Sequence, residues 1–160
     1  MSYTPTYATD RAEIEDLMAR YLFALDFHDA DAYAATFAED GELDWAMGVI
    51  NGREAIRAEA ASMKAKMAEA FGGDTQLRHF VTNIVISVDG DRASTRAAWF
   101  EAMNNGPDGS PAMGSFGHYD DELARIDGRW RFKFRRINNE FLEGRQAGPV
   151  NPVTVMDQIP

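Results

Sequence analysis

The apolar pattern of this chain changes its period once, near residue 73, and does not change back. Before that point, apolar side chains recur every three or four residues, as on one face of a helix. After it they alternate with polar side chains, as in strands that bury one face. Strands are expected over 77–88, 92–103, 113–126 and 129–140. Helices followed by a run of consecutive strands indicate the α+β class rather than alternating α/β units.

The first half is expected to supply three helices and one further strand. An apolar stripe marks the first helix, with Asp10 as its N-cap. The expected elements are a helix over 10–25, a short helix that packs Tyr33 and Phe37 inward, a strand over 42–47, and a helix that starts after Asn51 and ends at the glycine pair 72–73. Asp89-Gly90-Asp91 and Asp127-Gly128 are typical of tight hairpin turns between consecutive strands.

These elements predict a cone-shaped α+β barrel, with a strongly curved, mostly antiparallel sheet wrapped around three N-terminal helices. The barrel is expected to be one domain over residues 8–142. The segment 143–160, which contains three prolines, is expected to run irregularly as a subunit contact or a cover over the pocket. The mouth of such a cone is a usual place for a small-molecule site.

Composition excludes several classes of function. The formal net charge of -10 argues against nucleic acid or an anionic membrane surface as partner. Without cysteine there is no disulfide, thiolate metal site or cysteine nucleophile. No apolar run approaches the roughly 20 residues that cross a bilayer, and the N-terminal residues do not resemble a signal peptide. We therefore expect a cytoplasmic protein without membrane contact.

Asp26 stands in an unusual place. It falls in the last turn of the first expected helix, where the negative end of the helix dipole disfavours a carboxylate. A carboxylate in such a position often has a partner, and the chain has only three histidines. His79 opens the first long strand and is the candidate partner. Tyr21 lies on the apolar stripe of the same helix as Asp26, so its hydroxyl should point inward.

A series of short motifs resembles the SnoaL-like branch of the nuclear transport factor 2 superfamily, which has a cystatin-like fold. The resemblance covers roughly residues 8 to 142, in the same order throughout. The motifs are Ile14-Glu15-Asp16-Leu17, Arg20-Tyr21, Ala24-Leu25-Asp26, Phe37-Ala38-Glu39-Asp40-Gly41, Asn51-Gly52-Arg53-Glu54-Ala55-Ile56, Val88-Asp89-Gly90-Asp91, Gly117-His118-Tyr119 and Asp127-Gly128-Arg129-Trp130.

Within this superfamily the chain is most similar to lyases with an Asp–His dyad: scytalone dehydratase, bile acid 7α-dehydratase and hexachlorocyclohexane dehydrochlorinase. Asp26 and His79 match the dyad, and Tyr21 matches the phenol one helical turn before the aspartate. Arg135 matches a basic residue that the last strand brings to the pocket. Arg136 lies on the opposite face of that strand, so the register decides which arginine points inward.

The resemblance implies a cofactor-independent, dehydratase-like elimination on a small hydrophobic compound, aromatic or alicyclic, that bears a hydroxyl group. Asp26 would hold the Nδ1 proton of His79 and leave Nε2 bare as the base. Tyr21 and Arg135 would donate to the leaving group or to a developing oxyanion. Loss of water, halide or formaldehyde would use the same groups, and the sequence does not separate them.

Four further residues are predicted to contact the substrate. Trp45 is interpreted as a pocket wall, and Asn83 shares the face of His79 if its strand is regular. His118, on the third long strand, is a candidate pocket residue, and Met113 suits a bulky apolar ligand. No metal or organic cofactor is expected, because the three histidines show no ligand spacing.

Two other functions stay open at this stage. Isomerase or polyketide-cyclase chemistry would also use an acid–base residue in the cone. A non-catalytic ligand-binding module, like the small subunits of aromatic-ring dioxygenases, would share the fold without the chemistry. A homo-oligomer, a trimer or a dimer, is expected in each case.

Overall fold

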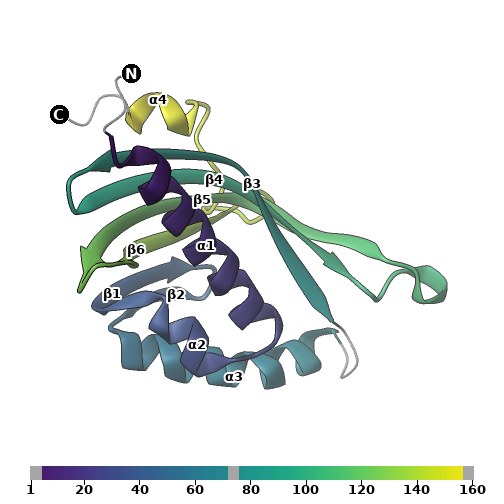
Figure 1. Ribbon diagram of the computed structural model, residues 1–160. Helices are drawn as coiled ribbons and strands as arrows, with labels where there is room; N and C mark the ends of the chain where they lie inside the picture. The colour runs from purple at the N-terminus through teal and green to yellow at the C-terminus, as the bar shows by residue number, and fades with distance from the viewer. Residues whose placement is uncertain (1–4, 72–75, 157–160) are drawn as a thin grey trace.

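One curved sheet dominates the computed structural model, which describes residues 5–71 and 76–156. Helix α1 lies across the concave side of the sheet, and α2 and α3 close its lower end (Figure 1). The elements are α1 (Tyr7–Asp26), α2 (Ala30–Ala35), β1 (Phe37–Trp45), β2 (Gly48–Asn51), α3 (Arg53–Phe71), β3 (Leu77–Asp89), β4 (Arg92–Met103), a 3-10 turn (Pro107–Gly109), β5 (Ala112–Ile126), β6 (Arg129–Asn139) and α4 (Pro152–Met156).

The described strands form a six-stranded sheet in the order β2-β1-β6-β5-β4-β3. Every neighbouring pair is antiparallel except β1 and β6, which run parallel. Both residues of the Asp127-Gly128 turn have the positive φ angles that a type I′ hairpin requires, and Gly90 has a positive φ angle in the other turn. The α+β cone with a mostly antiparallel sheet is confirmed.

The segment 37–41 differs from the sequence-based prediction. It was expected to end the second helix and break the chain at Gly41, but it is the first half of β1. Phe37 pairs with Phe132 of β6, so this parallel strand supplies hydrogen-bond partners for the backbone of the segment. A Cβ atom on Gly41 would lie 3.0 Å from the Phe132 carbonyl oxygen, so this glycine permits close approach rather than a break.

Two smaller differences concern the start of α1 and an additional strand. Helix α1 begins at Tyr7, so Asp10 is buried inside its first turns and pairs with Arg125 instead of capping the helix. Strand β2 was not predicted, because its four residues carry little alternation. The predicted stop of the third helix at residues 72–73 lies outside the described residues.

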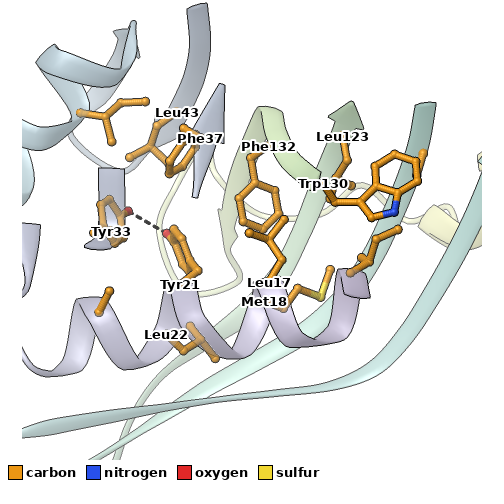
Figure 2. Packing of buried hydrophobic residues seen from close by; sticks show 14 of the residues in the cluster. Leu17, Met18, Tyr21, Leu22, Tyr33, Phe37, Leu43, Leu123, Trp130 and Phe132 are labelled. Atoms are coloured by element: carbon orange, nitrogen blue, oxygen red, sulfur yellow. Dashed lines mark hydrogen bonds between the residues drawn. The ribbon is translucent and has the colours of Figure 1, made fainter. Parts of the chain in front are cut away.

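The core lies between α1 and the inner face of the sheet. Figure 2 shows the side chains of α1 packed against Phe37 of β1 and Phe132 of β6. Ile14, Tyr21 and both phenylalanines are fully buried. Each buried side chain of this size contributes about 1.5–3 kcal/mol. No helix in the described ranges is long and apolar enough to cross a membrane.

The C-terminal segment docks on the domain through Arg145. The Arg145 guanidinium donates to the Asp44 carboxylate at 2.6 Å and to the Ile137 carbonyl oxygen at 2.6 Å. Further on, α4 buries Met156. The segment that was predicted to be irregular therefore contains a short helix and a fixed contact with β1 and β6.

Substitution of Gly117 tests how closely β5 and β6 must approach one another. A Cβ atom at this position would lie 1.8 Å from the carbonyl oxygen of Asn138. Gly117→Ala should therefore destabilise the protein by about 1–3 kcal/mol, because backbone atoms must shift. Urea unfolding would measure this, with Gly148→Ala as control because its Cβ meets open space. Equal stability of the two variants would contradict the strand packing described above.

Candidate active site

Asp26 and His79 are in direct contact. Asp26 ends α1, and His79 is the third residue of β3. The His79 Nδ1 atom lies 2.6 Å from Asp26 Oδ1, and the His79 backbone N–H donates to Asp26 Oδ2 at 2.9 Å. The two side chains are only 15% and 6% exposed. Both carboxylate oxygens are thus used to orient one residue, which explains a carboxylate at the unfavourable end of a helix.

Glu101 is a third member of this cluster, and the sequence interpretation missed it. It lies on β4 directly opposite His79, and its Oε2 is 3.0 Å from His79 Nε2. Its other oxygen accepts the Ser115 N–H at 2.9 Å. The alternation of β4 could have revealed it, because Glu101 follows Trp99 on the inner, buried face of the strand.

These contacts determine the charge of His79. Burial alone would lower its pKa, but the hydrogen bonds with Asp26 and Glu101 outweigh burial and raise the pKa to about 9. Burial alone would raise the pKa of Glu101, yet the hydrogen bonds from His79 and Ser115 lower it. At neutral pH, His79 is therefore an imidazolium between two carboxylates. The Nε2 atom that was expected to be bare faces Glu101 instead.

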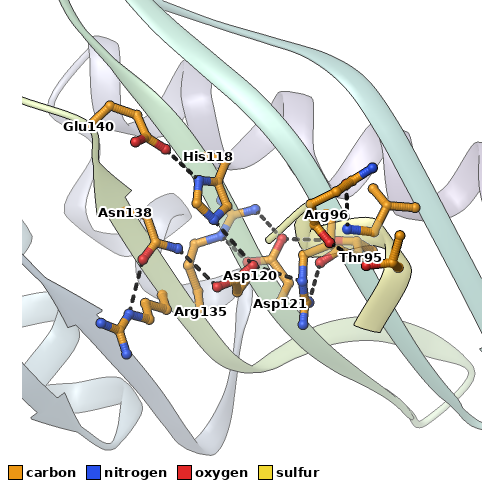
Figure 3. Close-up of polar contacts among 12 residues, drawn as sticks. Thr95, Arg96, His118, Asp120, Asp121, Arg135, Asn138 and Glu140 are labelled. Carbon is orange, nitrogen blue, oxygen red and sulfur yellow. Dashed lines mark hydrogen bonds and ion pairs between the residues drawn. The ribbon is translucent and has the colours of Figure 1, made fainter. Parts of the chain in front are cut away.

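Arg135 faces the inside of the cone, which settles the register question. It is fully buried, whereas Arg136 lies on the outer face. Its guanidinium donates to both oxygens of Asp121, at 2.7 and 2.8 Å, and the Thr95 hydroxyl donates to the same carboxylate at 2.8 Å (Figure 3). Burial alone would lower the pKa of Arg135, but the Asp121 charge outweighs burial and raises it. The sequence pattern predicted the direction of this side chain but not its ion pair.

Tyr21 belongs to the same buried cluster. The Arg135 guanidinium lies 4.2 Å from the centre of the Tyr21 ring and 4.1 Å from that of Tyr119. The Tyr21 and Tyr33 hydroxyls are 2.8 Å apart, and burial raises the pKa of both (Figure 2). Tyr21 is fully buried. None of the hydrogen bonds found for Tyr21 or Arg135 reaches the Asp26–His79 pair.

Trp45 lines a small cavity. Its side chain is half-buried, and the cavity beside it has a volume of about 20 Å³. Leu25, Tyr33 and Met63 form other parts of the wall. This space suffices for about one water molecule. The interior that was expected to be an open pocket is filled by aromatic side chains and the Arg135–Asp121 pair.

His118 lies on the opposite face of the sheet from the dyad. Tyr119 is its inward neighbour on β5, so alternation turns His118 outward. Its Nδ1 is 2.9 Å from a Glu140 carboxylate oxygen, and its Nε2 is 3.6 Å from Asp120, as Figure 3 shows. The prediction that His118 lines the pocket is therefore not supported.

Asn83 and Met113 are also away from the dyad. The β3–β4 pairing shifts register between Thr82 and Val85, and Asn83 has a positive φ of 51° there. The prediction for Asn83 assumed a regular strand, and this bulge leaves its side chain exposed instead. Met113 is 70% exposed on the arm formed by β4 and β5. The described residues contain no group of three or more acidic or histidine side chains that could hold a metal ion.

Comparison with known proteins identifies the family of this chain. Residues 6–136 match the SnoaL-like domain family. The chain therefore belongs to the SnoaL-like domain family, within the nuclear transport factor 2 superfamily.

Two of the similar proteins come from Mycobacterium tuberculosis. Rv2910c of Mycobacterium tuberculosis, an uncharacterized protein, is 29% identical over 133 residues, which are 82% of this chain and 86% of the relative. A variant of Rv3472 from the same organism, of unknown function, superposes with a TM-score of 0.73 at 29% identity, over 94% of this chain and 85% of that one. A candidate scytalone dehydratase from Novosphingobium aromaticivorans has a TM-score of 0.71 at 24% identity, over 93% and 98%, and shows the shared fold.

The charge of His79 predicts how stability depends on pH. Its pKa is about 9 in the folded protein and about 6.5 when unfolded, so only the folded state holds the proton between these values. The contribution is complete below about pH 6.5, and up to about 3 kcal/mol is lost as pH rises through 9.

As pH rises from about 6.5 to about 9, the unfolding free energy should therefore fall more steeply for the native protein than for His79→Gln. His118→Gln serves as the matched control, because His118 also contacts a glutamate but lies on the outer face. Parallel pH curves for the native protein and His79→Gln would show that His79 is not held as a cation.

Proposed function

We propose that this protein is a cofactor-independent lyase that eliminates water from a small hydrophobic, hydroxylated compound with an aromatic or alicyclic ring. One observation carries the proposal: His79 is fixed by Asp26 through two hydrogen bonds, at 2.6 and 2.9 Å, at the inner edge of the cone. Such an oriented imidazole transfers protons and typically contributes about 10² to 10⁴ in rate. Elimination requires only proton transfer and departure of the leaving group, so these side chains suffice for it.

The charges around His79 favour a neutral substrate. Asp26 and Glu101 flank the ring, and the positive charge of Arg135 is already neutralised by Asp121. A substrate carboxylate would meet two negative groups, whose charge the His79 imidazolium and the neighbouring Arg78 already offset. The nearby ring of Trp99, whose centre is 6.2 Å from that of His79, supports an apolar ring beside the reacting carbon.

Tyr21 and Arg135 have a structural role in this proposal rather than a direct role in proton transfer. Both are fully buried and bonded to partners of their own. Their donation to a leaving group or an oxyanion, the role implied by the resemblance, requires a substrate that displaces part of the interior. We therefore assign the proton chemistry to Asp26 and His79, and to Tyr21 and Arg135 the shape and polarity of the cone behind them.

An isomerase is the second candidate. The contact between His79 Nε2 and Glu101 Oε2, at 3.0 Å, joins two groups that can each carry a proton. Such a pair could take a proton from one carbon and return it to another. The same assay separates the two functions, because isomerisation leaves the mass of the compound unchanged.

The test is a panel of neutral β-hydroxy ketones and cyclic alcohols, incubated with the purified protein and followed by mass spectrometry. The reference compound is the aldol adduct of benzaldehyde and acetone, which loses water to give benzylideneacetone. We expect loss of water, and His79→Gln and Asp26→Asn should each slow it by about 10² to 10⁴.

His118→Gln is the matched control and should retain full activity, because His118 lies on the outer face. Loss of formaldehyde from hydroxymethyl ketones of the panel, or of hydrogen halide from halogenated analogues added to it, would identify another leaving group. Full activity of His79→Gln would refute the proposed site.

A further inference from the structure

A second ionisable side chain blocks the nitrogen that a histidine base would need. Glu101 is only 7% exposed, and its Oε2 lies 3.0 Å from His79 Nε2. With Asp26 on Nδ1, both ring nitrogens of His79 face carboxylates. Burying a carboxylate is costly unless it is paired, and here two carboxylates share one imidazole. A neutral acceptor could fill the same space without that cost.

The neighbouring strand β5 leaves room for this carboxylate. A Cβ atom at Gly114 would lie 2.8 Å from both Cγ and Oε1 of Glu101, so a glycine leaves the necessary room. The Ser115 N–H fixes Oε1 at 2.9 Å and holds the carboxylate toward His79. If His79 were the base, Glu101 would only inhibit it, by occupying Nε2.

We propose that Glu101 is the catalytic base and that the His79 imidazolium is the catalytic acid, an assignment that rests on the lyase function proposed above. Glu101 takes the proton from the substrate carbon next to the carbonyl group, and the electron pair of that C–H bond is held as an enolate until it forms the new double bond. The C–O bond breaks toward oxygen, which takes the Nε2 proton of His79 and leaves as water. Glu101 is then neutral acid and His79 neutral imidazole.

The contact between the two residues also resets the site. The proton on Glu101 passes to His79 Nε2 across the 3.0 Å contact, which restores the carboxylate and the imidazolium without another reactant. Because base and acid are adjacent, the proton and the hydroxyl leave from the same face of the substrate. Asp26 does not touch the substrate; it is a positioning residue that orients the ring and stabilises its charged form.

Substitution of Glu101 distinguishes the two possible roles of His79, because they predict opposite results. With the benzaldehyde–acetone adduct or another active panel member, Glu101→Gln should lower the rate by about 10² to 10⁴. If His79 is the base, the same change frees Nε2 and the rate at neutral pH should rise. Glu140→Gln is the matched control, because it removes a glutamate that contacts a histidine on the outer face.

The pH dependence of the rate gives an independent reading. The charged groups near His79 are Asp26 from α1, Glu101 from β4, and Arg78 beside it on β3, which donates to the Asp26 carbonyl oxygen. An imidazolium acid requires the rate to fall as pH rises through about 9, whereas an imidazole base requires it to rise. A rise would overturn the proposal.

Exchange in heavy water separates the two steps. His79→Gln should still exchange the C–H next to the ketone, because Glu101 remains, while losing dehydration. Glu101→Gln should lose both, and Gly114→Ala, which displaces the carboxylate, should reduce both. Dehydration that needs His79 but not Glu101 would refute this assignment alone. No His79-dependent reaction with any panel member would refute the lyase function and this assignment together.

Discussion

The buried ion pair of Arg135 and Asp121 governs the interior of this protein. Removing a guanidinium from water costs several kcal/mol, and here both charges are fully buried. The cost is offset by two short hydrogen bonds and by aromatic rings on the guanidinium faces, with Phe132 only 3.9 Å from its carbon. Three neighbouring strands and α1 therefore pack around one charged side chain, which occupies the interior of the cone.

A filled cone places the reactive groups at its edge. The Asp26–His79–Glu101 cluster joins the end of α1 to β3 and β4, and its histidine keeps 15% of its side chain exposed. The helix dipole, burial and mutual repulsion would each disfavour two carboxylates here. A protonated imidazole between them offsets all three effects. The arrangement favours a charged histidine, as the proposed acid role of His79 requires.

Most helices and strands could be predicted from the sequence, because the patterns that indicate them are local. Alternation and the Asp127-Gly128 turn placed the strands, and helical spacing placed α1. The start of β1 was predicted too late, because a glycine such as Gly41 usually ends a helix or strand. Here Gly41 is needed for the close approach of β6, which is distant in sequence. The family resemblance correctly predicted the contact between Asp26 and His79, but it gave no indication of Glu101. The bulge at Asn83 and the outward turn of His118 depend on register, which single-strand patterns do not fix.

The protonation of His79 decides most directly between these readings of the site. Nitrogen-15 spectra of the imidazole side chains can follow the chain's three histidines as pH is raised, with His79→Gln assigning the signals. We expect both ring nitrogens of His79 to carry protons at neutral pH, with a midpoint at about 9. A His79 that titrates near its ordinary value of about 6.5, with Nε2 bare at neutral pH, would contradict the charged cluster on which this account depends.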